Sequence, residues 1–315
     1  ADDIFDGVSG AIAALPNDHA AGNFAGMDQS MSADHMEGFL NVAFDIATAV
    51  VDSNSVLIDF VGESCATNAW DTACRQRFIE NFGEVALRHP LTNQEVNFYA
   101  GASDYRELIA TMLMAPSFLT LEQYRGSEDP SASYVTMLSP YELVSKLSYH
   151  FWQTMPDQRL MNDAASGEIM TNYDGIVTRV FNDPRTRANM PEFFGGWLRI
   201  DEIPEFDLSK PERDNFLSVD YGTGTNLPAN LNLAVYRQAA IDEVLAFIDY
   251  TTFVENGSLE DLFTSTSSFA TDPYLARAYG VTPWAGGNAT PVPFTSSQPR
   301  SGLLSRAALQ MYGDF

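Results

Sequence analysis

The clearest pattern of apolar and polar positions lies in residues 138–156, LSPYELVSKLSYHFWQTMP. Leu143, Leu147 and Phe151 recur at helical spacing, and neighbouring aromatic side chains widen the apolar stripe. A serine, a proline and a glutamate stand just before the stripe, in the order typical of a capping box with proline in the first turn. The helix is expected to end near Met155, because the next residue is proline. Such a broad apolar face predicts a buried helix.

The same spacing predicts helices in most of the remaining chain. They are expected over residues 32–51, 71–87, 105–121, 173–182, 186–200, 232–254, 259–263, 272–279 and 302–311. Pro116 is expected to interrupt the third of these. A linker is expected at residues 125–133, and a long irregular excursion at residues 210–228. Period-two alternation is scarce, so the predicted fold is all-α, a multi-helix orthogonal or bundle-like array with long loops and little or no sheet.

The charge balance narrows the range of partners. The chain of 315 residues has 42 acidic and 17 basic residues, a net charge of −25. This excess of negative charge disfavours nucleic acid and anionic membrane surfaces. It suits a strongly solvated surface, and an acidic face that binds calcium or a partner is the alternative, although no EF-hand pattern occurs. No apolar run approaches the roughly 18 residues of a membrane span, so none is expected.

The two cysteines, Cys65 and Cys74, lie nine positions apart in CATNAWDTAC. On one continuous helix this spacing would place them about 13 Å apart, too far for a bond. The residues between them include Thr67, Asn68 and Asp71, which favour turns and caps. We therefore expect a Cys65–Cys74 disulfide, with free thiols as the alternative. A disulfide implies an oxidising compartment.

The candidate ligand side chains are few. The histidines are His19, His35, His89 and His150. His150 lies on a predicted buried face, where a core histidine is the usual reading and a ligand the alternative. His35 and Met36 are candidates for residues near a haem, against simple packing. His19 and Asp18 are candidates for a metal site, against a solvated loop. His89, before a proline, is expected at a helix end.

Other catalytic chemistry has little support. No G-x-S-x-G elbow occurs, and the glycine-containing loops do not follow strands. Asp242 with Glu243, and Glu192 with Asp201, are candidate carboxylate pairs for glycoside hydrolysis. The alternative is that these carboxylates cap helices or solvate their faces.

Several motifs carry a family resemblance. The stretch LSPYELVSKLSYHFWQTMPD resembles the signature of the DUF1592 module, abundant in Planctomycetes and Myxobacteria, and the likeness continues through RVFNDPRTRANMPEFFGGWLRIDEIP and SSFATDPYLARAYGV. Upstream, CRQRFIENFGEVALRHPLTNQEV is similar to the DUF1595 module and AGNFAGMDQSMSADHMEGFLNVAFDIA to the end of DUF1587, whereas PRSGLLSRAALQ resembles the start of DUF1588. The resemblance implies modules at residues 1–60, 61–125, 134–281 and 282–315, in a chain cut at both ends.

The resemblance also implies a setting. Members of the family are typically exported, to the periplasm, the exterior or the cell surface, and accompany c-type cytochrome modules. Relatives carry a CxxCH motif in the DUF1588 region; none occurs here, so a haem c would be attached outside this chain. At position 150 the family usually has an aromatic or apolar residue. The implied partners are other fragments of the same precursor or a cytochrome c subunit.

The leading functional expectation is therefore a redox-associated helical scaffold or partner of a c-type cytochrome domain, with an oxidoreductase subunit as one form of it. A structural or surface-assembly protein with an acidic binding face is one alternative. A carbohydrate-processing enzyme is another.

Overall fold

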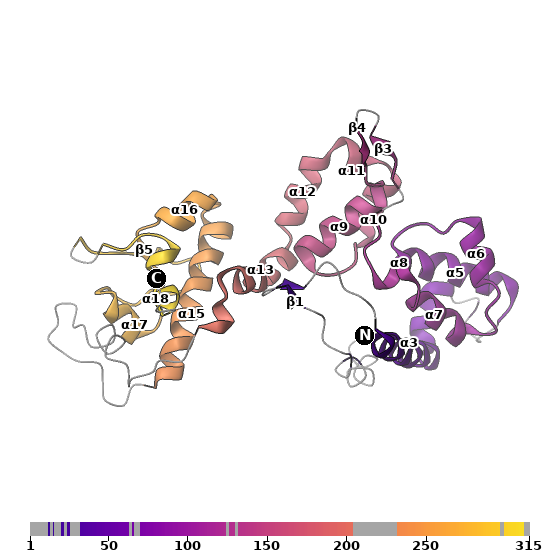
Figure 1. Cartoon of the computed structure of the whole chain (residues 1–315), viewed down its shortest axis with the longest axis horizontal. Coiled ribbons are helices and arrows are strands. Elements are labelled where there is room, and N and C mark those ends of the chain that lie inside the picture. Colours follow the sequence, from indigo (N-terminus) through magenta and orange to yellow (C-terminus); the bar gives the residue numbers. More distant parts are fainter. Residues whose placement is uncertain are drawn as a thin grey trace. The chain divides into compact units, whose positions relative to one another are not determined.

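The structure, a computed structural model, describes residues 32–62, 65, 70–123, 126–129, 132–203, 232–296 and 299–311, together with Ile12, Leu15, Ala20–Ala21 and Phe24–Ala25. The expectation of a mainly α fold is confirmed, and Figure 1 shows helices in every part that is described. The strands in this part of the chain form three antiparallel pairs, of which the first joins β1 (Ala20–Ala21) to β2 (Phe24–Ala25). The chain divides into two compact units, Ala1–Asp183 (unit 1) and Pro184–Phe315 (unit 2).

The first group of helices in unit 1 surrounds one hydrophobic core. Its members are α3 (Ala33–Asp52), α4 (Asn54–Val61), α5 (Thr72–Leu87), α6 (Asn93–Tyr99), α7 (Tyr105–Leu113) and α8 (Pro116–Leu119). Phe78, Ile79 and Leu108 are completely buried at its centre. The helix predicted over residues 105–121 is divided into α7 and α8, because Ala115 is extended immediately before Pro116.

The second group in unit 1 has its own core. It contains the hairpin of β3 (Glu128–Asp129) and β4 (Ala132–Thr136), and then α9 (Pro140–Trp152), α10 (Gln158–Ala165), α11 (Glu168–Thr171) and α12 (Tyr173–Phe181). The capping box predicted from Ser139 and Glu142 is present. Helix α9 ends earlier than predicted, because Gln153 takes a left-handed conformation with φ 53°. Trp152 anchors α9 to α12, since its Nε1 donates a hydrogen bond to the carbonyl of Val180 at 3.2 Å.

Unit 2 is built around α15 (Leu233–Asp249). The other elements are α13 (Pro184–Leu198), η2 (Ile200–Glu202), the π-helical turn η3 (Tyr250–Val254), α16 (Leu259–Thr264), β5 (Ser267–Ser268), α17 (Pro273–Ala278), β6 (Val292–Pro293), η4 (Leu303–Ser305) and α18 (Ala307–Gln310). The helix predicted over residues 302–311 is broken at Arg306, whose backbone is extended. The excursion predicted at residues 210–228 lies outside the described residues.

A buried polar cluster lies inside the aromatic core of unit 2. Arg306 Nη1 lies 2.7 Å from Glu243 Oε1, and the guanidinium packs 4.1 Å from the ring centre of Phe247. The hydroxyl of Tyr279 donates to Glu243 Oε2 at 3.3 Å and accepts from the backbone N–H of Ala307 at 2.7 Å. These contacts join α15 to the segment that contains η4 and α18. Residues 299–311 therefore complete the core of unit 2.

Candidate partner-binding site

An apolar groove on unit 1 has the dimensions of a binding site. Helices α3, α6, α7 and α8 enclose a cavity of about 400 Å³. Its lining residues are mostly apolar: Leu40, Phe44, Phe98, Tyr99, Glu107, Ala110, Thr111, Met114, Ala115 and Pro116. Volumes of this order are typical of ligand and side-chain binding clefts.

The groove lies where the apolar face of α3 is only partly covered. The residues that α3 buries are Val42, Ala43, Ala47 and Val50. Met36, Leu40 and Phe44, which recur at intervals of four on the same side as Ala47, form an exposed stripe at 41%, 42% and 47% exposure. Phe98 on α6 is 69% exposed. Large apolar side chains gathered in the open are uncommon on a soluble protein and mark interaction surfaces.

The charges around the groove are almost all negative. Glu107 is the one charged residue of its lining, and it accepts hydrogen bonds from the backbone and the hydroxyl of Ser103. These two hydrogen bonds lower the pKa of Glu107, so its carboxylate stays ionised at neutral pH. Arg106 on α7 is held by Asp52 of α3 at 2.6 Å. The groove thus combines an apolar floor with one ionised carboxylate in its lining.

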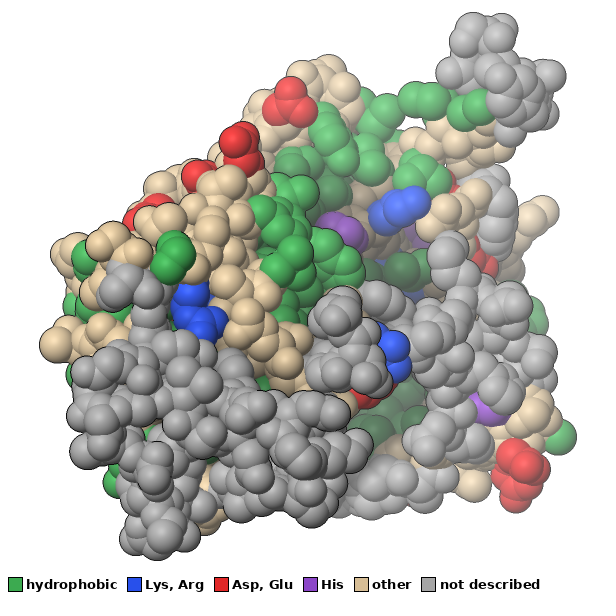
Figure 2. All heavy atoms as spheres, turned by 60° about the vertical axis from the view of Figure 1, so that its left-hand side comes forward, with side chains coloured by type: hydrophobic (Ala, Val, Ile, Leu, Met, Phe, Trp, Pro, Cys, Tyr) green, Lys and Arg blue, Asp and Glu red, His purple; other side chains and the backbone are tan. Residues whose placement is uncertain are grey.

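Figure 2 also shows apolar side chains exposed on the face in view, with several Asp and Glu side chains away from them. The exposed side chains of unit 2 include Phe193 and Trp197 on α13, at 50% and 43%, with their ring centres 6.1 Å apart. Apolar exposure is therefore a feature of both units.

A polar crevice lies where the end of α5 meets α8 and the start of α9. Arg88 there is 6% exposed and donates to the carbonyls of Ser117, Phe118 and Thr120, at 3.2 Å to Phe118 and 2.7 Å to Thr120. Its guanidinium also lies 5.6 Å from the ring centre of Tyr149. Arg88 satisfies the last carbonyls of α8 and ties α5 to α8 and α9.

His89 borders the same crevice, a residue that the sequence predicted only as a helix end. It is 8% exposed; its Nδ1 donates to the carbonyl of Pro90 at 2.9 Å, and its Nε2 lies 3.8 Å from Glu95. Glu142 and Ser145 of α9 face it across a cavity of about 20 Å³, room for about one water molecule. The crevice is too small for an organic substrate. Its burial depends on α8 and α9, so no local sequence signal predicted it.

The residues predicted to lie near a haem, His35, Met36 and His150, are on two separate helices. His35 is part of the capping box of α3, with Nδ1 2.7 Å from Ser32 Oγ. Met36 stands at the start of the exposed stripe. His150 was expected on a buried face, and this is wrong: its side chain is exposed, and its ring packs edge-on against Phe151. Because α3 and α9 belong to different cores of unit 1, the structure does not unite these residues in one pocket. Their role near a haem stays a prediction.

The predicted metal candidates, Asp18 and His19, lie outside the described residues. Within the described part of the chain, no group of three or more His, Cys, Asp or Glu side chains is placed to hold a metal ion. None of the described helices combines the length and apolar character needed to cross a membrane.

The candidate carboxylate pairs are not arranged for glycoside hydrolysis where the structure describes them. Asp242 is exposed and accepts from Gln238 at 2.8 Å, whereas Glu243 is buried in the ion pair of unit 2. Adjacent residues of a helix point in different directions, so these two carboxylates do not face one cleft. Glu192 is exposed on α13, and the side chain of Asp201 is outside the described part.

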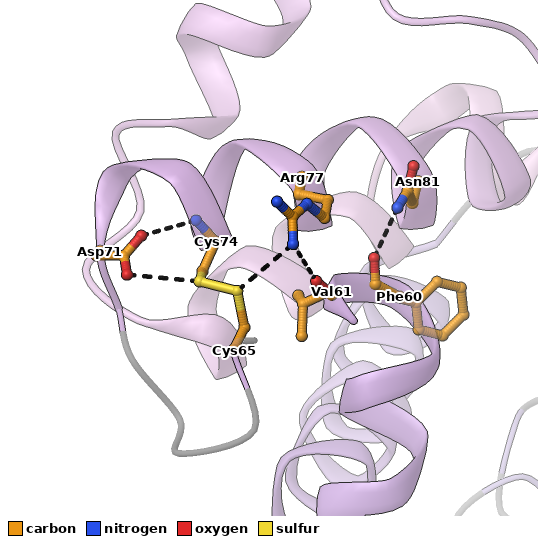
Figure 3. The surroundings of a disulfide bond; sticks show 7 residues. All are labelled: Phe60, Val61, Cys65, Asp71, Cys74, Arg77 and Asn81. Atoms are coloured by element: carbon orange, nitrogen blue, oxygen red, sulfur yellow. Dashed lines mark hydrogen bonds between the residues drawn. A yellow bond between two sulfur atoms is a disulfide. The ribbon is translucent and has the colours of Figure 1, made fainter. Parts of the chain in front are cut away.

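The predicted disulfide is present. Cys65 and Cys74 are bonded with their Cα atoms 5.9 Å apart (Figure 3). Asp71 caps α5 by accepting the N–H of Cys74 at 2.8 Å, and Arg77 donates to the carbonyl of Val61 at 2.7 Å (Figure 3). The bond fastens the region after α4 to the first turn of α5. Its presence is consistent with an exported protein.

Comparison with known families confirms the resemblance carried by α9. Residues 138–281 match the family described as a protein of unknown function (DUF1592). No curated protein and no solved structure matches the chain. The match crosses the division between the two units at Asp183, and Arg306 lies beyond its end. The module boundaries expected at residues 60, 125 and 281 stay predictions.

Proposed function

We propose that the chain is an exported helical scaffold that binds a c-type cytochrome domain through the groove of unit 1. The exposed stripe of Met36, Leu40 and Phe44 carries this proposal, because it presents apolar area that the chain's own core does not use. Met36, a candidate for proximity to a haem, stands at one end of that stripe. A docked haem edge would then lie over apolar side chains.

Two further properties support the proposal. The Cys65–Cys74 disulfide is suited to the oxidising compartments in which c-type cytochromes reside. The net charge of −25 would attract a basic partner from a distance and speed its association. Redox encounters use small interfaces, often below about 1,200 Å², so one groove is sufficient surface.

The haem belongs to the partner in this proposal. It would supply the one-electron chemistry, and the residues of this chain would orient the partner and exclude water from the contact. No electron-transfer step is assigned to a side chain of this protein.

The test is to isolate the native particle under mild conditions and to record its optical spectrum and the masses of its chains. We expect a Soret band and a haem-bearing polypeptide that is separate from this chain. Replacing Leu40→Asp together with Phe98→Ser should release that polypeptide, whereas Val235→Asp, at a site of unit 2 that is 56% exposed, should not. A particle without a Soret band would overturn the proposal.

Carbohydrate processing is a second candidate, favoured by the exposed rings of Phe193 and Trp197 beside Glu192. Aromatic faces of this kind can stack against sugar rings. Incubation with a panel of polysaccharides should then release reducing sugars, and Trp197→Ala should abolish the release. No release from any member of the panel would remove this candidate.

A further inference from the structure

We infer that the groove of unit 1 binds a cationic amphipathic segment of a partner chain, in which two or three large apolar side chains are flanked by Lys or Arg. This inference rests on the proposed function only in taking the occupant to be a protein. It adds the chemistry that the occupant must have, and it does not require a haem.

The floor of the groove is apolar. Leu40 and Phe44 on α3 face the cavity together with Phe98, Met114 and Pro116 of the other helices. At about 400 Å³ the cavity is far larger than a water site, and its only charged lining residue is Glu107. An apolar anchor would displace water from this floor, as in the helix-in-groove mode of peptide recognition.

The four helices that line the groove carry many negative charges and one positive charge. Helices α3, α6 and α8 contain no Lys or Arg, and α7 contains only Arg106, which Asp52 already holds at 2.6 Å. The same helices carry the carboxylates of Asp34, Glu37, Asp45, Asp52, Glu95 and Glu107. An anionic or neutral segment would lose solvation without gaining a counter-ion. A segment with flanking Lys or Arg would gain attraction at the rim.

Glu107 lies where the apolar floor meets the charged rim of the groove. It lines the apolar cavity and is held by Ser103, so its charge stands at a fixed place on the rim. A cation next to an apolar anchor is the arrangement that meets both features at once. Specificity then follows from charge sign and apolar content together.

The experiment uses the whole chain and three fluorescent helical peptides of equal length. The first has Leu at positions i, i+4 and i+7 with Lys on the flanks. In the second the lysines are replaced by glutamates, and in the third the leucines are replaced by serines. We expect the first peptide to bind at least about tenfold more tightly than either of the others. Added salt should weaken its binding, because the rim charges are exposed.

Variants locate the site. Leu40→Ser and Phe98→Ser should each weaken the first peptide by about tenfold. Glu107→Gln should weaken it less and reduce the salt dependence. Val235→Ser is the matched control, an exposed apolar residue of unit 2, and should change nothing. Circular dichroism checks that each variant is folded; if the serine variants are not, Glu107→Gln and the three peptides decide the question.

Three outcomes would overturn the inference. Equal binding of the leucine-free peptide would show general attraction to an acidic protein, and equal binding of the glutamate peptide would show no charge selection. A dimer of the chain alone that Phe98→Ser dissolves would make a second copy the occupant. Peptide binding without haem in the native particle would keep this inference and reject the proposed cytochrome partner. Haem in the native particle, released by the groove variants, with no binding of the first peptide, would keep the cytochrome partner and reject this inference.

Discussion

Arg306 places a guanidinium nitrogen 2.7 Å from a carboxylate oxygen of Glu243, and neither side chain has any contact with solvent. Removing two charges from water costs several kcal/mol per ion, and hydrogen bonds to the remaining polar atoms offset part of that cost. Here Arg306 Nε donates to the carbonyl of Gly302 at 3.1 Å, and Glu243 Oε1 accepts the N–H of Phe269 at 3.3 Å, whereas Arg306 Nη2 has no hydrogen-bond partner among the described residues. The pair is therefore part of a network that includes backbone from two other segments.

Breaking this pair on one side should destabilise unit 2 strongly. Arg306→Met leaves the Glu243 carboxylate buried without a counter-ion, and we expect a loss of about 3–5 kcal/mol in the free energy of unfolding. The double variant Glu243→Leu with Arg306→Met should recover much of this loss, because both charges are gone. Chemical denaturation followed by tryptophan fluorescence measures both. Arg187→Met, which breaks the exposed pair with Asp249, is the control and should cost at most about 1 kcal/mol.

Tyr279 should resist ionisation as long as unit 2 is folded. Burial and the neighbouring Glu243 carboxylate raise the pKa of Tyr279 well above its usual value near 10. The protonated form is favoured by the fold, so its contribution to stability is complete below pH 10 and is lost as the pH rises above that value. A spectroscopic alkaline titration should include a late step in which buried tyrosines ionise on unfolding. Tyr279→Phe should reduce the amplitude of that step by one tyrosine; an unchanged amplitude in a folded variant would contradict the assignment.

The guanidinium group of Arg88 should be required for the stability of unit 1. Arg88→Ala would leave the last carbonyls of α8 without their donor at a buried site, at a cost of about 1–3 kcal/mol for each unsatisfied group. Arg88→Lys should rescue little, because an ammonium cannot reproduce the planar fork that reaches three carbonyls. Thermal unfolding of unit 1 measures the effect. A lysine variant as stable as the original protein would contradict the role given to the guanidinium.

The disulfide should stabilise unit 1 chiefly by limiting its unfolded state. For so short a loop, replacing Cys65 and Cys74 with alanine should cost about 2–3 kcal/mol. Denaturation with and without a reductant measures this cost in the original protein. The alanine variant serves as the control, since a reductant should not change its stability.

Local features were predictable from the sequence, because their partners lie within a few residues. The predicted capping box of Ser139 with Glu142 connects residues three apart and is present, and Thr92 with Glu95 forms a second box of the same kind. The disulfide could also be predicted, since a turn between Cys65 and Cys74 was the only geometry that permitted it.

Features set by distant parts of the chain were not predictable. Leu40 and Ala47 lie seven residues apart on one side of α3, and only the packing of the other helices decides that Ala47 is buried and Leu40 is exposed. The same is true of His150, exposed on a helix that is otherwise well buried, and of His89, enclosed by elements that come later in the chain. The groove follows from this partial covering of one helix face, so its position could not be predicted from periodicity.

The separation of 63 residues between Glu243 and Arg306 also affects the order of events during synthesis. At translation rates of about 5–20 residues per second, Arg306 is added roughly 3–13 s after Glu243. Throughout that interval the nascent unit 2 has a carboxylate with no counter-ion to bury, whereas all of unit 1 has already been made. The core of unit 2 therefore cannot close until residues 299–311 are available, whereas unit 1 does not depend on them.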